Sequence, residues 1–234
     1  MEKPCANCAH RQAAEWSVLK GASVTDMDCA RRPRNFLAGE AIYHEGDAAT
    51  GVYCVSSGLI GIRKVDADGE SVLLRLVRPG ETFGYRSLLT GMPHSVGAEA
   101  LKETRICFVP APAMHRMTAE NPALVMAFFH HLARDMAEAE TKVLETVTAS
   151  CRVRFLRLLV ALGGDADRDA GCEVHLELPV SRQDIASLIG VRSETMSRII
   201  RAIEDEGLAH FKGRHVDIPD CRRLADESLG GLAA

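Results

Sequence analysis

The order of apolar and polar positions divides the chain into a strand-rich part and a helical part. Between residue 34 and about residue 109, short runs of β-branched and aromatic residues alternate with glycines. Many short strands at close, regular spacing predict an antiparallel sandwich or barrel. Asp68-Gly69 lies between two such runs and predicts a hairpin turn. The expected strands are AIYH, GVYCV, LIGIRKV, SVLLRLV and RICFV.

A helical pattern follows, from residue 121 to about residue 162, and we expect glycines 163 and 164 with Asp165 to end it. Such a long apolar stripe exceeds what one small β domain can cover, so we expect it to form a dimer seam. Packing within the same chain is the alternative. The apolar positions recur at spacings of three and four: Leu124, Phe128, Leu132, Met136, Ala139, Val143 and Val147.

The segment 180–207, VSRQDIASLIGVRSETMSRIIRAIEDEG, predicts two short helices joined by a turn at Gly190-Val191. A helix with an apolar back and a front of Glu, Ser and Arg suits the major groove of DNA. The next segment, AHFKGRHVDIPD, predicts a β-hairpin turning at Lys212-Gly213, which would be the wing of a winged helix-turn-helix. The expected apolar positions are Ile185 and Leu188 in the first helix, and Met196, Ile199, Ile200 and Ile203 in the second. The opposite face of the second helix carries Glu194, Ser197, Arg198 and Arg201.

Composition narrows the functional classes. The net charge of −4 excludes a bulk polycation, so DNA specificity must rest on residue placement. Apolar runs are too short to span a bilayer, and the N-terminus lacks a secretory signal, so we expect a cytoplasmic protein with reduced thiols. No Gly-rich phosphate loop, HExxH or GxSxG motif appears, and we do not expect an enzyme.

The 234-residue chain contains eight cysteines, which in a reducing compartment suggests a metal or redox role for some of them. Cys54 and Cys151 are interpreted as small buried apolar residues. Cys5 and Cys8 form a C-x2-C pair in a polar arm, residues 1–30, where a short helix is expected near Trp16.

The whole layout resembles the Crp–Fnr transcription regulators. The motifs that carry the resemblance are FLAGEAIYHEGD, GVYCVSSGLIGI, VRPGETFG and SETMSRII. It covers nearly the whole chain and implies an α+β fold and a homodimer that binds double-stranded DNA, with RNA polymerase as a further partner. The implied domains are the cysteine-bearing arm (1–30), a β-roll sensor domain of the cyclic-nucleotide-binding, jelly-roll type (31–118), a dimerisation helix (119–150) and a winged helix-turn-helix (151–234).

The second helix of the pair resembles the recognition helix of the Fnr branch, which carries Glu, two residues, then Ser-Arg. Here these are Glu194, Ser197 and Arg198, and the resemblance implies inverted repeats of TTGAT type. An arginine fork reads guanine, and a carboxylate accepts from cytosine N4. Phosphate contacts are expected from Ser181, Arg182, Arg192, Arg201 and Lys212.

The resemblance also implies oxygen or redox sensing through an iron–sulfur cluster of 4Fe-4S type. Cys5 and Cys8 supply the expected pair, and Cys107 in LKETRICFVP matches the family's distant ligand. Ala14 stands where the family has its third cysteine, and we choose Cys29 as the substitute. His10 as a ligand, or a smaller cluster, remain alternatives.

Other effectors stay open at this point. For a cyclic nucleotide, FGYRSLLTGMPHSVGAEA places His94 where relatives have the phosphate-binding Arg, and a neutral His is a poor substitute for a permanent cation. A thiol/disulfide switch and a vestigial arm without a cofactor are two other possibilities. Haem would need an axial donor, and the candidates are His10, His94, His115, His130 and His131.

Overall fold

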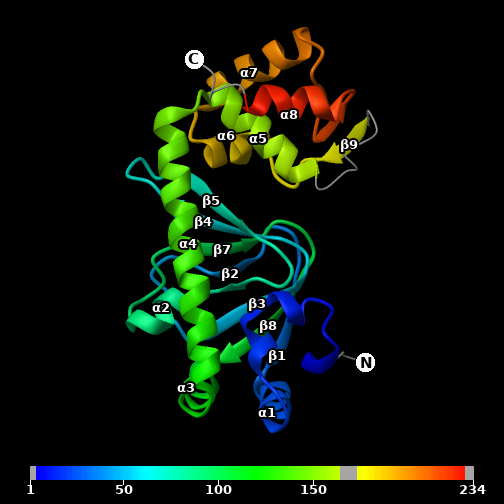
Figure 1. The fold of residues 1–234 in the computed structure, drawn as a ribbon. Coiled ribbons are helices and arrows are strands. Elements are labelled where there is room, and N and C mark those ends of the chain that lie inside the picture. Colours follow the sequence, from blue (N-terminus) through cyan, green and yellow to red (C-terminus); the bar gives the residue numbers. More distant parts are fainter. Residues whose placement is uncertain (1–3, 164–172, 230–234) are drawn as a thin grey trace. The chain divides into compact units, whose positions relative to one another are not determined.

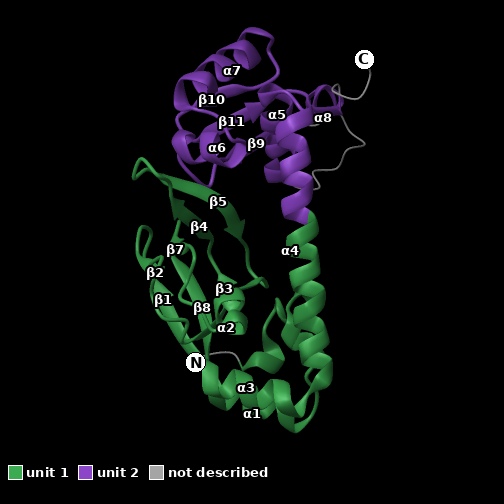
Figure 2. Cartoon of the chain, turned by 90° about the vertical axis from the view of Figure 1, so that its left-hand side faces the viewer, with its two compact units in different colours: residues 1–137 green, residues 138–234 purple. Residues whose placement is uncertain are grey.

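The computed structural model describes residues 4–163 and 173–229. The chain forms two compact units, residues 1–137 and 138–234 (Figure 2). Within the described ranges, every helix is too short or too polar to cross a lipid bilayer.

The first unit contains two four-stranded antiparallel sheets, which confirms the predicted β-rich sandwich (Figure 1). Sequence reasoning missed β1, β6 and β7, because RPRNF and GAEA do not alternate apolar and polar residues and TF is too short. One sheet has the order β1 (Arg32–Phe36), β8 (Thr104–Pro110), β3 (Gly51–Ser57), β6 (Thr82–Phe83). The other has the order β2 (Ala41–Tyr43), β7 (Gly97–Ala100), β4 (Ile60–Val65), β5 (Ser71–Val77).

The hairpin predicted at Asp68-Gly69 joins β4 to β5. The carboxylate of Asp66 accepts hydrogen bonds from the backbone N–H of Asp68 and of Glu70, each at 2.9 Å. Gly69 has a φ of 85°, which a residue without Cβ adopts at little cost. The turn therefore forms as the sequence predicts.

The two faces of β3 and β8 pack into different cores, because successive residues of a strand point to opposite faces. Tyr53, Val55, Ile106 and Phe108 face the interior of the roll. Val52 and Val109 face a second core, made with the N-terminal arm and the helices α1 (Ala22–Ala30), α2 (Tyr85–Thr90), α3 (Ala111–Glu120) and α4 (Pro122–Thr148). The described part of the arm before α1 contains three short 3-10 helices, η1 (Cys5–Asn7), η2 (Arg11–Ala13) and η3 (Glu15–Val18).

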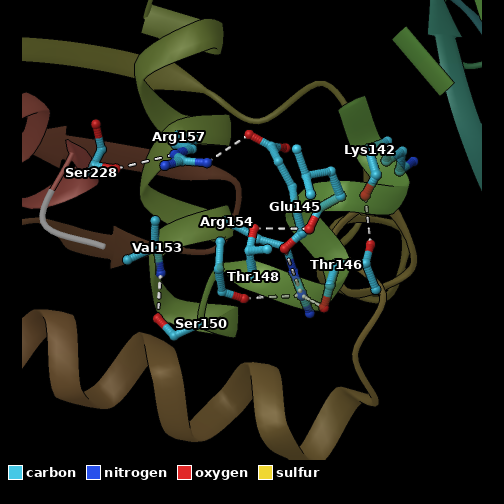
Figure 3. A network of polar contacts seen from close by, with 11 residues as sticks. Lys142, Glu145, Thr146, Thr148, Ser150, Val153, Arg154, Arg157 and Ser228 are labelled. Atoms are coloured by element: carbon cyan, nitrogen blue, oxygen red, sulfur yellow. Dashed lines mark hydrogen bonds and ion pairs between the residues drawn. The ribbon is translucent and has the colours of Figure 1, made fainter. Parts of the chain in front are cut away.

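The helical pattern after residue 121 is two helices rather than one run to residue 162, and the break lies beside the expected end of the dimerisation helix at residue 150. α4 ends at Thr148, and α5 (Cys151–Gly163) begins after a break at Ala149-Ser150. The Ser150 hydroxyl accepts the backbone N–H of Val153 at 3.2 Å. The Arg154 guanidinium donates to the carbonyls of Thr146 at 2.8 Å and Ala149 at 3.2 Å (Figure 3). These side chains satisfy backbone groups that a continuous helix would have paired internally.

In its described residues, the second unit holds a three-stranded sheet and four helices beyond the end of α4. The sheet confirms the predicted wing hairpin and adds β9, which the sequence reasoning missed. Gly164, Asp165 and Cys172 lie outside the described residues. The sheet order is β10 (His210–Lys212), β11 (His215–Ile218), β9 (Val174–Glu177). The helices after α5 are α6 (Arg182–Ile189), α7 (Ser193–Asp205) and α8 (Cys221–Leu229).

Candidate functional site: a recognition helix and a cysteine-lined cavity

The turn between α6 and α7 is fixed by local capping. The Ser181 hydroxyl accepts the backbone N–H of Asp184 at 3.1 Å, and the Asp184 carboxylate accepts the backbone N–H of Ser181 at 3.4 Å. This reciprocal capping box defines the start of α6. Gly190 ends α6 with a φ of 70°, as expected for a left-handed helix cap.

Helix α7 has the two opposed faces that its sequence predicts. Met196, Ile200 and Ile203 are buried, whereas Ile199 is half-buried. Two of the polar side chains on the front are held against the helix. The Ser197 hydroxyl donates to the Ser193 carbonyl at 3.0 Å, and Arg198 donates to the Thr195 hydroxyl at 3.3 Å. The exposed front consists of Glu194, Ser197, Arg198 and Arg201.

The predicted phosphate-contacting residues all lie on the surface of the second unit. Arg182 is the first residue of α6, Arg192 precedes α7, and Lys212 lies at the turn of the wing. Ser181 is exposed, and its hydroxyl also donates to the Asp184 carboxylate at 2.8 Å. The winged helix-turn-helix thus presents basic side chains at helix starts and at the wing, where phosphates are contacted in DNA-binding modules.

The first unit contains a cavity of about 320 Å³ between the N-terminal arm and the sheet that holds β3 and β8. Cys5 and Cys8 reach it from the arm, and Cys107 reaches it from β8. The structure therefore brings together three of the four predicted cluster ligands. A fourth thiol, that of Cys54 on β3, lines the same cavity. Other lining residues include His10, Arg11, Trp16, Met27, Arg31 and Arg105.

Two thiols of this cavity, those of Cys5 and Cys107, have pKa values raised above the ordinary value, which favours their protonated forms. Burial raises the pKa of Cys107 above its ordinary value, although the nearby Arg31 opposes that shift. Burial and the carboxylate of Asp28 also raise the pKa of Cys5. The Arg31 guanidinium donates a hydrogen bond to the sulfur of Cys107 at 3.6 Å. Its Nε also forms an ion pair with the carboxylate of Asp28 at 2.8 Å. A bound metal would have to displace these protons. Within the described ranges, no three His, Cys, Asp or Glu side chains already surround a single metal position.

The structure does not bring Cys29 to the cavity. Met27 of α1 and Arg31, the residue that follows this helix, both line it. Cys29 lies two residues from each, about 200° around the helix, and its side chain is exposed. The alternative ligand His10 does line the cavity. Cys54 was missed as a candidate ligand because its apolar neighbours suggested a core position. Its pairing with Cys107 across the two strands is what identifies it as a candidate.

The histidines considered for haem lie in separate places. His115 and His130 are exposed on α3 and α4. His94 is buried in the roll, where it stacks on Tyr43 with ring centroids 3.7 Å apart, and burial lowers its pKa. His131 is buried and contacts Glu15.

The predicted dimer seam is divided by the structure. Leu124 and Phe128 are buried in the second core of the first unit, and Leu132 packs against it. The remaining predicted positions, Met136, Ala139, Val143 and Val147, are exposed. An exposed stripe with alternating spacings of three and four, as in a coiled coil, also runs along α4. It comprises Met126, Phe129, Ala133, Met136, Glu140, Val143 and Val147.

Comparison with known proteins matches both parts of this arrangement. Residues 33–121 match the family model of the cyclic nucleotide-binding domain, and residues 153–227 match that of the Crp-like helix-turn-helix domain. The chain is 31% identical over 194 residues to the nitrogen fixation regulation protein FixK of Rhizobium meliloti, covering 82% of this chain and 85% of that protein. It is 24% identical over 233 residues to the transcriptional activator protein anr of Pseudomonas aeruginosa, covering 98% and 95%.

Solved structures show the same fold. The structure of FixK2 from Bradyrhizobium japonicum superposes with a TM-score of 0.71 and 25% identity, covering 84% of this chain and 96% of that one. A regulator of the CRP/FNR family from Thermus thermophilus superposes with a TM-score of 0.70 and 25% identity, covering 85% and 98%. The order of β-roll, long helix and winged helix-turn-helix, together with these similarities, shows that the chain belongs to the Crp/Fnr family of transcription regulators.

Proposed function

We propose that this regulator responds to oxygen or redox state and binds TTGAT-type inverted repeats as a homodimer. The observation that carries the proposal is the cavity in which Cys5 and Cys8 of the arm meet Cys107 of β8. The names of relatives, which include transcriptional activator proteins FnrA and anr, favour activation as the outcome and therefore RNA polymerase as a partner.

The donor set of the cavity fits an iron–sulfur cluster. Such clusters are held by cysteine thiolates, and among the residues that the structure describes the cavity is lined by four thiols and by no carboxylate. Arg31 and Arg105, which also line it, would offset the negative charge of thiolates and sulfide. When bound, the cluster supplies redox chemistry toward oxygen, and Cys5, Cys8 and Cys107 would hold it.

Contacts within the first unit link the arm to α4. Glu15 of the arm contacts His131 of α4, and Trp16 packs edge-on against Phe128 with ring centroids 5.5 Å apart. Because Cys5 and Cys8 lie on the same arm, holding the arm at the cavity would stabilise these contacts with α4. Release of Cys5 and Cys8 would loosen them, and α4 is the helix expected to join the two protomers.

The exposed stripe on α4 supports a dimer. Met136 is 64% exposed and Val143 is 65% exposed in a single chain, and a second copy of α4 could cover both. Two recognition helices would then read the two half-sites of an inverted repeat about one DNA turn apart.

A cyclic nucleotide is the second candidate, because residues 33–121 match a domain of that name. The interior of the roll argues against it. The rings of Tyr43, Tyr53 and Phe83 pack against one another there, and His94 stacks on Tyr43. His94 has a lowered pKa, so it is a neutral group and a poor partner for a phosphodiester at pH 7.

Anaerobic purification followed by a visible spectrum and by iron and sulfide analysis tests the proposal. A broad brown absorption that is lost in air is the expected result. A sharp Soret band would identify haem instead. A colourless protein without iron or acid-labile sulfide would contradict both, and isothermal titration with cAMP would then test the second candidate.

A further inference from the structure

We propose that Cys54, rather than Cys29, is the fourth cysteine of the cluster site. This inference rests on the proposed function and identifies the donor that completes its ligand set. The four ligands would then be Cys5, Cys8, Cys54 and Cys107.

Strand register places Cys54 beside Cys107. The two residues are direct cross-strand partners in the antiparallel β3–β8 pair. Directly opposed residues of an antiparallel pair project from the same face of the sheet, with Cα atoms about 4.5–5.5 Å apart. The face that carries them is the one turned toward the arm, since Val52 and Val109 pack there into the second core. Cys54 and Cys107 therefore present two sulfurs to the cavity from neighbouring strands.

The arm supplies the opposite side of the cavity. Cys5 packs against the second core and begins η1, and its backbone N–H donates to Asp28 of α1. Cys8 follows η1 directly. Two sulfurs from the sheet and two from the arm therefore enclose one space, which suits a cluster with four ligated corners.

The competing donors fit less well. Cys29 is exposed on the side of α1 away from Met27 and Arg31. Its sulfur would reach the cavity only if the helix rotated about its axis. His10 reaches the cavity, but imidazole is the less common ligand of such clusters. Cys54 already lines the cavity and needs no movement of the backbone to reach it.

The charge around the four sulfurs agrees with this assignment. Four thiolates in one cavity would repel one another, and bound iron removes that penalty. Arg31 and Arg105 line the same cavity and favour a net negative group.

The test compares Cys54→Ser and Cys54→Val with Cys29→Ser and His10→Gln, all after anaerobic reconstitution with ferrous iron and sulfide. We expect about four iron and about four sulfide per chain in the wild type, in Cys29→Ser and in His10→Gln. We expect both Cys54 variants to lose at least half of the iron and the brown absorption. Thermal unfolding of the metal-free proteins checks that the variants still fold.

A gain-of-ligand variant separates loss of a thiol from loss of fold. Ala14 lines the cavity and is 4% exposed, so Ala14→Cys in the Cys54→Ser background offers a replacement sulfur. Restored iron and absorbance would support the assignment. Full iron in both Cys54 variants, or loss in Cys29→Ser alone, would overturn it. A wild-type chain that binds no iron would instead contradict the proposed function, and a Cys54–Cys107 disulfide in that chain would indicate a thiol switch.

Discussion

The carboxylate of Glu15 contacts Nδ1 of His131, and this contact joins the N-terminal arm to helix α4. Both side chains are buried, with residue exposures of 5% and 7%. The other carboxylate oxygen of Glu15 accepts a hydrogen bond from Thr82 of β6 at 2.5 Å. One buried carboxylate therefore connects the arm, the sheet and the helix expected to lie at the dimer interface.

Replacing Glu15 with Gln should destabilise the protein by about 1–3 kcal/mol at pH 7, because buried partners lose a charged acceptor. Urea unfolding followed by circular dichroism measures this free energy. The matched control is Glu103→Gln, an exposed glutamate for which we expect a change of less than about 0.5 kcal/mol. Equal effects of the two substitutions would contradict the role assigned to Glu15.

The stabilisation by Glu15 should depend on pH. Burial raises the pKa of the Glu15 carboxyl, but the hydrogen bonds with His131 and Thr82 lower it by more. The pKa of Glu15 therefore lies below the ordinary value of 4.5. A carboxylate with a lowered folded-state pKa stabilises the fold above its unfolded pKa, and this contribution is lost as pH falls through the folded value. The difference in unfolding free energy between wild type and Glu15→Gln should be constant from pH 7 to about pH 5 and shrink below pH 4.5. A difference that grows on acidification would exclude this linkage.

The DNA contacts predict two different kinds of mutant. Arg198→Ala should cost about 1–3 kcal/mol and relax discrimination at one base pair, because a bidentate contact to guanine is lost. Lys212→Ala should weaken binding equally for all sequences and reduce the salt dependence. Fluorescence anisotropy with a TTGAT inverted repeat and single-base variants, at several salt concentrations, measures both. Uniform weakening by Arg198→Ala would make it a phosphate contact instead.

Two substitutions on different sides of α4 test whether its exposed stripe forms the dimer interface. Met136→Glu places a carboxylate in the stripe and should shift the protein toward monomer, since a charge buried at a helix seam is unfavourable. Arg134→Glu is the control. It lies about 200° from Met136 on the helix and is also exposed, so the oligomer should persist. Sedimentation velocity measures the mass of each. A monomeric wild-type chain would contradict the homodimer itself.

The fold class and the recognition helix could be predicted from sequence because local periodicity determines them. Met196, Ile200 and Ile203 are buried opposite Arg198, as their spacing requires. The apolar pattern alone did not predict the division of α4 from α5, which depends on side chains of Ser150 and Arg154 that satisfy backbone groups. The boundary expected at residue 150 came from the family resemblance instead. Apolar periodicity continues across that break and hides it.

The dimer seam and the cluster site were harder, for a different physical reason. Leu124 and Phe128 share a periodicity with Val143, yet tertiary packing buries the first two and exposes the third. Cys54 resembles a core residue in GVYCVSSG, and only the register with Cys107 brings it to the cavity. Such partners are distant in sequence, so a local pattern cannot identify them.

The alternation of β3 and β8 has an evolutionary consequence. Tyr53, Val55, Ile106 and Phe108 fill the roll, whereas Cys54 and Cys107 stand between them on the other face. Alternate positions of each strand therefore lie in different environments. A descendant could gain or lose the cysteine chemistry by point mutation without repacking the roll, and a stable scaffold could pass from one kind of signal to another while keeping its DNA-binding machinery.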